Sequence, residues 1–268
     1  MDTQRPAGRP TLVELLRSSA ALLSRCAAQA FAVLALGLVP GALLAAVVFV
    51  ATGVVSREAL NETIRSGDWL RASPLLLAGV VKRLLASLAF VALVFAVEAR
   101  QAGRPLTTRE AYGLAVSRFP AFLWTLALAV LRISGGLLLF VVPGLYLALR
   151  YTLAHLSVLL EDLRGKPALD RSASLVSADP LRALGFMLLA TLLAVGLNVL
   201  CAVLVSVFTG VSAALGAGSV GVVQGQFEAL AAELLESMVG AWLVCFSVLL
   251  YKDLAGRLPV PGRDRASA

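Results

Sequence analysis

Long apolar runs separated by short charged connections are the main pattern along this chain. The longest run, Phe119–Leu160, has 42 residues and holds only three side chains that can carry positive charge: Arg132, Arg150 and His155. A helix needs about 20 residues to cross the hydrocarbon core of a bilayer, so this run is long enough for two crossings. Gly135-Gly136 and Pro143-Gly144 lie near its middle and favour a reversal of the chain. The pattern therefore predicts a transmembrane hairpin.

The remaining runs predict a membrane domain over residues 10–257, between a disordered N-terminus at 1–9 and a basic tail at 258–268. Its six predicted transmembrane helices are residues 26–56, 75–97, 119–140, 143–160, 183–208 and 233–251. Residues 10–25 carry leucines at mostly helical spacing, with Thr11 as a candidate N-cap, and predict a helix that lies on the membrane surface. Pro40-Gly41 is expected to kink the first span.

Composition supports the same class. The chain is 59% hydrophobic and 15% charged, whereas soluble domains have about 25% charged residues. No segment alternates with period two over a strand's length, which argues against a membrane β-barrel. We therefore predict an all-α, polytopic membrane helix bundle with short interfacial helices. The first apolar run is too long for the core of a cleavable signal peptide, so none is expected.

Basic residues are distributed unequally between the two sides of the predicted bundle. The termini and the connections at 98–118 and 161–182 together hold sixteen Lys and Arg residues, and the opposite side holds Arg57, Arg65 and Arg71. Because cytoplasmic loops of membrane proteins are enriched in Lys and Arg, both termini are predicted to be cytoplasmic, in a bacterial inner membrane. The net charge of +7 is thereby explained by topology, and nucleic acid is not expected as a partner.

Three segments resemble one another and suggest an internal repeat: PTLVELLRSSAALLSR, PLTTREAYGLAVSR and PALDRSASLVSADPLR. Each begins with proline and ends in arginine just before an odd-numbered predicted span. One hypothesis is a threefold repeat of an interfacial helix followed by a hairpin, related by an axis along the membrane normal. The alternative is that any cytoplasmic connection that enters a span is basic and amphipathic.

The residues give little support for catalysis or for a cofactor. The single histidine, His155, has no acidic neighbour in its span, and no phosphate-binding loop or metal-binding motif occurs. Glu161 and Asp162 are interpreted as solvated carboxylates at a helix end. Cys26, Cys201 and Cys245 lack metal or redox spacing and are interpreted as packing residues. We expect a protein that is not an enzyme and that has no cofactor or metal.

Polar residues inside the apolar runs carry the strongest functional signal. Counting about 1.5 Å per residue from the cytoplasmic end of each span places several of them in one layer, between the middle and the outer third of the membrane. The candidate cluster comprises Arg83, Arg132, Arg150, Asn198, Glu233 and Glu236. An unpaired charge at the bilayer centre costs about 2.5–3.5 kcal/mol, so Glu233 and Glu236 are expected to pair with Arg83 and Arg132. The cluster either stabilises the bundle or uses its excess of cations to hold an anion such as a lipid phosphate.

A family resemblance rests on VPGLYLALRY, on Glu161, Gly165, Ala168-Leu169, Arg171-Ser172 and Leu175-Val176, and on the closing LLYKDLAGR. Over about residues 10–257 the chain resembles the YciC-type bacterial inner-membrane proteins and the similar membrane domain of some glycerophosphodiester phosphodiesterases. The resemblance implies a six-helix membrane module. It does not imply phosphodiesterase activity, because the chain has no segment for that catalytic barrel.

Two functions remain open at this point. The first is a non-enzymatic inner-membrane protein that binds membrane lipids or scaffolds a membrane protein partner. The alternative is a small transporter or permease-like subunit, for which repeats, kinked spans and buried charges are equally expected. An intramembrane lipid enzyme would need His155 close to Glu233 and Glu236, and the depths counted along the spans argue against it.

Overall fold

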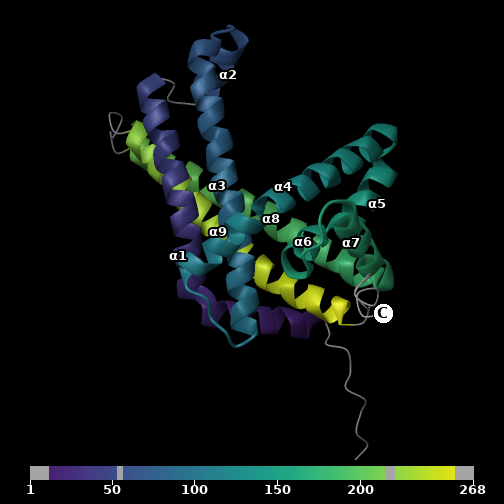
Figure 1. The fold of residues 1–268 in the computed structure, drawn as a ribbon. Coiled ribbons are helices and arrows are strands. Elements are labelled where there is room, and N and C mark those ends of the chain that lie inside the picture. The colour runs from purple at the N-terminus through teal and green to yellow at the C-terminus, as the bar shows by residue number, and fades with distance from the viewer. Residues whose placement is uncertain (1–11, 53–56, 215–220, 257–268) are drawn as a thin grey trace, which may run out of the picture.

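The computed structural model describes residues 12–52, 57–214 and 221–256, and the regular elements in these ranges are all α-helices (Figure 1). They are α1 Leu12–Thr52, α2 Arg57–Arg65, α3 Trp69–Gln101, α4 Thr108–Leu139, α5 Val141–Tyr151, α6 Ala154–Glu161, α7 Lys166–Ala178, α8 Pro180–Ala214 and α9 Gly221–Ala255. The predicted all-α class is thus confirmed for this part of the chain.

The predicted surface helix and first span form one helix, α1, rather than two. Its N-terminal part lies across the base of the molecule before the helix turns upward (Figure 1). Pro40 lies inside α1, and the helix continues to Thr52. Thr11, the predicted N-cap, lies outside the described residues.

Hydrogen bonds from distant residues hold the lower part of α1 in place. The Arg100 guanidinium donates to the Arg25 carbonyl over 2.9 Å, and the Gln29 amide donates to the Leu106 carbonyl over 2.5 Å. The Tyr112 hydroxyl on α4 donates to the Val33 carbonyl over 2.7 Å. These contacts fasten α1 to the end of α3 and the start of α4.

Local capping explains where α4 begins. The Thr107 hydroxyl accepts a hydrogen bond from the Glu110 N–H, and the Glu110 carboxylate accepts one from the Thr107 N–H over 2.7 Å. This capping box satisfies two backbone donors that the first turn would otherwise leave unpaired. From this cap α4 runs without a break to Leu139, so the predicted connection at 98–118 supplies its first turns.

The reversal predicted within residues 119–160 occurs at Phe140, between α4 and α5. The predicted fourth span at 143–160, however, is not one helix. It is divided into α5 and α6, of 11 and 8 residues, which are separated at Thr152 and Leu153. At about 1.5 Å per residue, α5 is about 16 Å long, roughly half of a hydrocarbon core of about 30 Å.

A buried core lies in the lower half of the molecule, which we call the base. Here the C-terminal ends of α3 and α9, which are predicted to be cytoplasmic, pack against α1, α4, α6 and α7. Among the largest fully buried side chains are Leu93, Leu156, Leu175, Phe246 and Tyr251. Cys26 and Cys245 are buried free thiols, as expected of packing residues, and the side chain of Cys201 lies outside the described residues.

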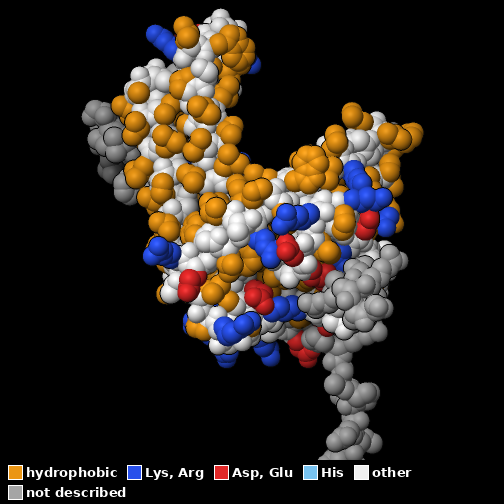
Figure 2. Space-filling view, viewed as in Figure 1, with side chains coloured by type: hydrophobic (Ala, Val, Ile, Leu, Met, Phe, Trp, Pro, Cys, Tyr) orange, Lys and Arg blue, Asp and Glu red, His pale blue; other side chains and the backbone are white. Residues whose placement is uncertain are grey.

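Two arms rise from the base and enclose an open hollow. One arm contains the upper parts of α1 and α3 with α2 at its end, and the other contains the end of α4 with α5 (Figure 2). Apolar side chains cover both arms, whereas Lys, Arg, Asp and Glu gather on the base and at the α2 end. Such extensive exposed apolar surface is typical of contact with lipid rather than water.

Four helical segments in the described residues are long and apolar enough to cross a membrane: Val13–Thr52, Trp69–Gln101, Thr108–Leu139 and Ser237–Ala255. A fifth is reached if α7 and the described start of α8, which meet at an angle of 104°, count as one broken span. A multi-pass membrane protein follows from this finding. Six spans and the threefold repeat stay predictions.

Candidate functional site

The structure describes four of the six candidate side chains. Arg83 on α3 is exposed, while Arg132 on α4, Arg150 on α5 and Glu233 on α9 are half-buried. The side chains of Asn198 and Glu236 lie outside the described residues. The shared polar layer as a whole therefore stays a prediction.

Glu233 pairs with Lys82 and not with Arg83 or Arg132, which corrects the pairing expected from depth alone. The Lys82 ammonium lies 2.7 Å from a Glu233 carboxylate oxygen, and both side chains are largely shielded from solvent. Successive residues of a helix point about 100° apart, so Lys82 and Arg83 cannot both face α9. The lysine faces α9 and the arginine is exposed.

A second ion pair joins the same two helices in the base. The Lys252 ammonium on α9 donates to the Glu98 carboxylate on α3 over 3.2 Å. The two pairs are separated by sixteen residues along α3, or about 24 Å. They hold α3 and α9 in parallel at two levels.

Arg132 lies on α4 and Arg150 on α5, the two helices of the hairpin, and we call them the hairpin arginines. A Cβ placed on Gly136 would lie 3.0 Å from the Gly144 Cα, so these two glycines face each other across the hairpin. Counting outward from this pair puts Arg132 level with Ala148, half a turn from Arg150. The two guanidinium groups therefore belong to one level of the hairpin.

The hairpin arginines have no carboxylate partner among the described residues. The Arg150 guanidinium lies 5.5 Å from the centroid of the Tyr146 ring, within the range of a cation–π contact. Its Nε is buried and makes no hydrogen bond. A guanidinium in this position can still donate hydrogen bonds to an anionic oxygen.

A buried ion pair in the base was missed at the sequence level. The Arg171 guanidinium on α7 donates through Nε and Nη2 to both carboxylate oxygens of Glu161 on α6, over 2.9 to 3.2 Å. The Arg171 side chain is 2% exposed and that of Glu161 12%, so Glu161 is not the solvated carboxylate that we expected. Its neighbour Asp162 is 53% exposed and does fit that expectation, with Arg118 as an ion-pair partner.

One signal in the sequence indicates this pair. One face of α7 is buried and carries residues at helical spacing: Ala168, Ser172, Leu175 and Val176. Arg171 falls on this same face. An arginine within an apolar stripe requires a buried acceptor. These are also residues on which the family resemblance rests, so that motif is part of the packed base.

Hydroxyl groups complete the polar contacts of the base. The Ser172 hydroxyl donates to the Arg150 carbonyl over 2.7 Å and accepts from the Leu153 N–H over 3.2 Å. It thereby satisfies backbone groups on both sides of the break between α5 and α6. The Tyr251 hydroxyl on α9 donates to the Ser157 hydroxyl on α6 over 3.2 Å.

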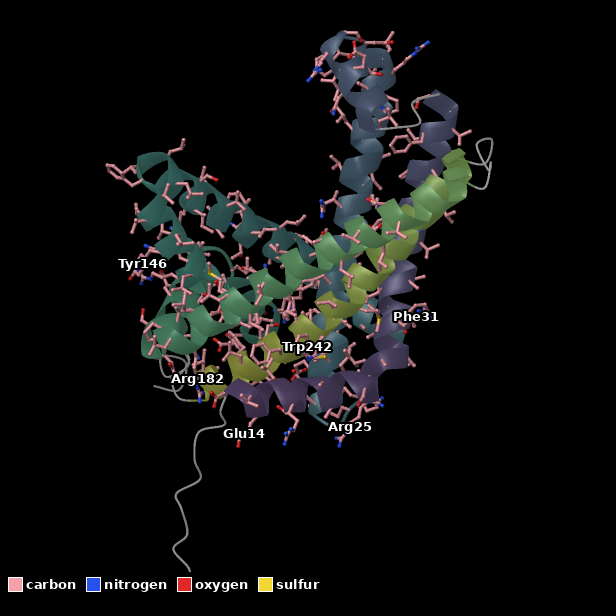
Figure 3. The ribbon with its side chains drawn as sticks, turned by 180° about the vertical axis from the view of Figure 1, so that it is seen from behind. Glu14, Arg25, Phe31, Tyr146, Arg182 and Trp242 are labelled. Carbon is pink, nitrogen blue, oxygen red and sulfur yellow. The ribbon has the colours of Figure 1, made fainter. Side chains whose placement is uncertain are left out.

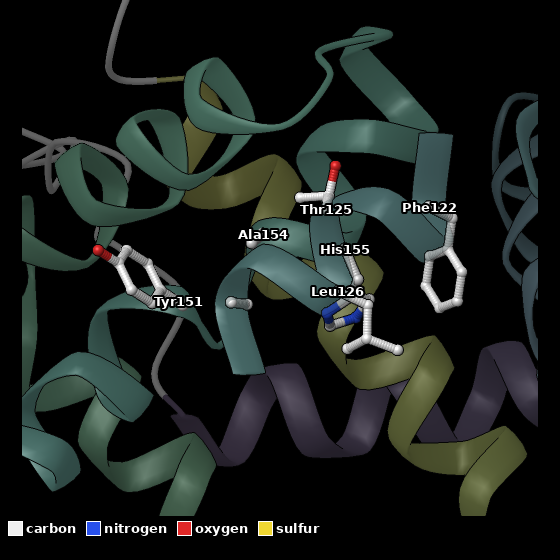
Figure 4. A pocket seen from close by; sticks show the side chains of 7 residues that line it. Phe122, Thr125, Leu126, Tyr151, Ala154 and His155 are labelled. Carbon is white, nitrogen blue, oxygen red and sulfur yellow. The ribbon is translucent and has the colours of Figure 1, made fainter. Parts of the chain in front are cut away.

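Two hollows lie beside these contacts. A cavity of about 50 Å³ is lined by Phe122, Thr125, Leu126, Ala129, Tyr151, Ala154 and His155 (Figure 4). A more open pocket of about 290 Å³ is lined by Phe95, Glu98, Leu159, Leu160, Tyr251, Lys252 and Ala255. No carboxylate lines the histidine cavity, so the described residues offer no acid–base pair at His155. Nor do they contain a group of three or more metal-binding side chains.

Comparison with known proteins agrees with this class of membrane protein. A UPF0259 membrane protein of Sodalis glossinidius (strain morsitans) is 32% identical over 103 residues, which is 38% of this chain and 40% of that relative. No protein-family model and no solved structure matches the chain. The relative supports the resemblance to bacterial membrane proteins. The similarity to the membrane domain of glycerophosphodiester phosphodiesterases stays a prediction.

Proposed function

We propose that this chain is a multi-pass protein of the bacterial inner membrane that binds phospholipid and has no catalytic role. Both termini are proposed to be cytoplasmic, as the distribution of basic residues favours. In this proposal the hairpin arginines bind the lipid phosphate, and the apolar arms contact its acyl chains. The proposal includes a scaffolding role, in which the helices of this chain bind a membrane protein partner.

A contrast between two groups of cations carries the proposal. Cations of the first group each lie against a carboxylate: they are Lys82, Arg118, Arg171, Arg182 and Lys252. Arg132 and Arg150 have no such partner in the described part of the chain, although both are half-buried on an arm that is otherwise apolar. A guanidinium can donate two parallel hydrogen bonds to phosphate, and such charge-assisted bonds are about twice as strong as neutral ones.

Native mass spectrometry of the full chain extracted in mild detergent tests this proposal. We expect retained phospholipid with the natural sequence and loss of that lipid in the double variant Arg132→Gln/Arg150→Gln. The matched control is Arg104→Gln/Arg109→Gln, which removes the same charge from two exposed positions, one in the α3–α4 connection and one in the first turn of α4. Equal lipid retention in all three proteins contradicts the proposal.

The alternative function, a small transporter or permease-like subunit, is favoured by a different observation. The chain is interrupted between α5 and α6 and bends by 104° between α7 and α8. Interrupted helices line substrate and ion sites in many transporters. Solute uptake into vesicles that contain the purified protein, at a rate above that of empty vesicles, supports this alternative over lipid binding.

A further inference from the structure

We propose that the α4–α5 hairpin does not cross the membrane but enters and leaves it on the cytoplasmic side, with its turn in the hydrocarbon and the hairpin arginines among the lipid phosphates. This inference rests on the lipid binding proposed above and names its place: the headgroup level of the cytoplasmic leaflet. The ligand class is the phosphate group of a membrane phospholipid.

The composition of the turn is the first observation. Five consecutive residues at the turn are large, apolar and between 71% and 87% exposed: Leu138, Leu139, Phe140, Val141 and Val142. No charged residue occurs between Arg132 and Arg150. A hairpin that crossed the bilayer would place this turn in water, where five adjacent exposed apolar side chains are unfavourable. In hydrocarbon the same side chains are favoured.

The chain itself provides a comparison with a turn that carries charges. At the end of the other arm, where α2 meets α3, the charged residues are Glu62 and Arg65 on α2, Asp68 in the connection and Arg71 on α3. Asp68 caps α3 by accepting a hydrogen bond from the Arg71 N–H. Figures 1 and 3, which are related by rotation about the vertical, both show this end rising higher above the base than the α4–α5 turn. In both views the α4–α5 turn thus lies nearer to the base than the α2 end does.

Length gives the third observation. From Phe140, Arg132 is eight residues away and Arg150 ten, or about 12 and 15 Å along the helices. Half of a hydrocarbon core is about 15 Å, so a turn at the bilayer midplane puts both guanidinium groups at the phosphates of one leaflet. At this level the hairpin arginines need no carboxylate.

An aromatic residue on the hairpin fits the same placement. Tyr146, six residues from Phe140, lies against the Arg150 guanidinium. Tyrosine and tryptophan are enriched at the boundary between headgroups and hydrocarbon. Arginine beside tyrosine at one level of an otherwise apolar hairpin is the composition expected at that boundary.

Cysteine accessibility in the full chain, in membrane vesicles of both orientations, tests this inference. In a background without Cys26, Cys201 and Cys245, single cysteines replace Phe140 in the turn, Ser66 in the α2–α3 connection and Ala102 between α3 and α4. All three positions are exposed, so the substitutions leave the packed core intact. A membrane-impermeant maleimide should label S66C only from the periplasmic side and A102C only from the cytoplasmic side.

For F140C we expect no labelling from either side and full labelling in detergent. A fluorophore attached there should be quenched more by lipids brominated near the ends of their acyl chains than by lipids brominated near the headgroup. Labelling of F140C from the periplasmic side, or a disulfide between two copies through this cysteine, overturns the inference. Lipid retention is measured separately, so the proposed function and this topology can fail independently.

Discussion

Gly136 and Gly144 face each other across the α4–α5 turn, and a methyl group added to either would lie less than 3.0 Å from a leucine side chain. A Cβ on Gly144 would lie 2.4 Å from the Leu137 Cγ, and one on Gly136 would lie 2.9 Å from a Leu147 methyl carbon. The close approach sets the register of the hairpin and thereby brings Arg132 and Arg150 to one level.

The first prediction concerns these two glycines. Gly144→Ala should destabilise the protein by about 1–3 kcal/mol, the usual cost of overpacking, and should lower its melting temperature in detergent. Gly135→Ala is the matched control, because a Cβ there would meet nothing within 4 Å. Equal melting temperatures for the two variants would show that the close approach is unimportant for stability.

The second prediction concerns the buried pair of Arg171 and Glu161. Glu161→Gln removes the charge that balances the Arg171 guanidinium, and loss of one partner from a buried ion pair costs about 3–5 kcal/mol. We expect a large decrease in the melting temperature of the detergent-solubilised chain. Asp162→Asn, which changes an exposed carboxylate next in the chain, should cost far less. A similar decrease in both variants would contradict the buried pairing.

The third prediction separates two adjacent cations on α3. Lys82→Gln should destabilise the packing of α3 against α9, because it leaves the half-buried Glu233 carboxylate without its partner. Arg83→Gln should change stability little, because this side chain is exposed and has no ion pair in the described residues. Thermal unfolding of both variants is the measurement, and a larger effect of Arg83→Gln would be inconsistent with the structure.

The fourth prediction concerns the break between α5 and α6. Ser172→Ala removes the hydroxyl that binds the Arg150 carbonyl and the Leu153 N–H, and should cost about 1–3 kcal/mol. Ser174→Ala is the control on the same helix, because among the described residues its hydroxyl donates only to the Arg171 carbonyl one turn back. Hydrogen exchange of residues 150–156 should accelerate in the first variant and remain unchanged in the second.

The sequence predicted the helical class and the position of the reversal, because length, apolar composition and glycine and proline pairs are local signals. It did not predict the break between α5 and α6. Thr152 and Leu153 are not helix-breaking residues, and the hydroxyl that supports the break belongs to Ser172, far along the chain. A single helix over 143–160 was therefore the natural but wrong prediction.

Counting depth along the spans located the candidate residues but not their partners. Depth does not distinguish Lys82 from Arg83, since they differ by one residue in height and by about 100° in direction. The partner of Arg171 was missed for another reason. Glu161 lies in a polar stretch at the end of α6, and its burial depends on how α7 folds back over it.

The two ion pairs between α3 and α9 have opposite polarity at their two levels. At the upper level α3 contributes the lysine and α9 the glutamate, while in the base α3 contributes the glutamate and α9 the lysine. Copies of this protein in one membrane share one orientation, so α3 beside α3 of another copy would set lysine against lysine and glutamate against glutamate. The same holds for α9 beside α9. The polarity of these pairs therefore favours α9 over a second α3 as the neighbour of α3, and disfavours self-association of two copies through like helices.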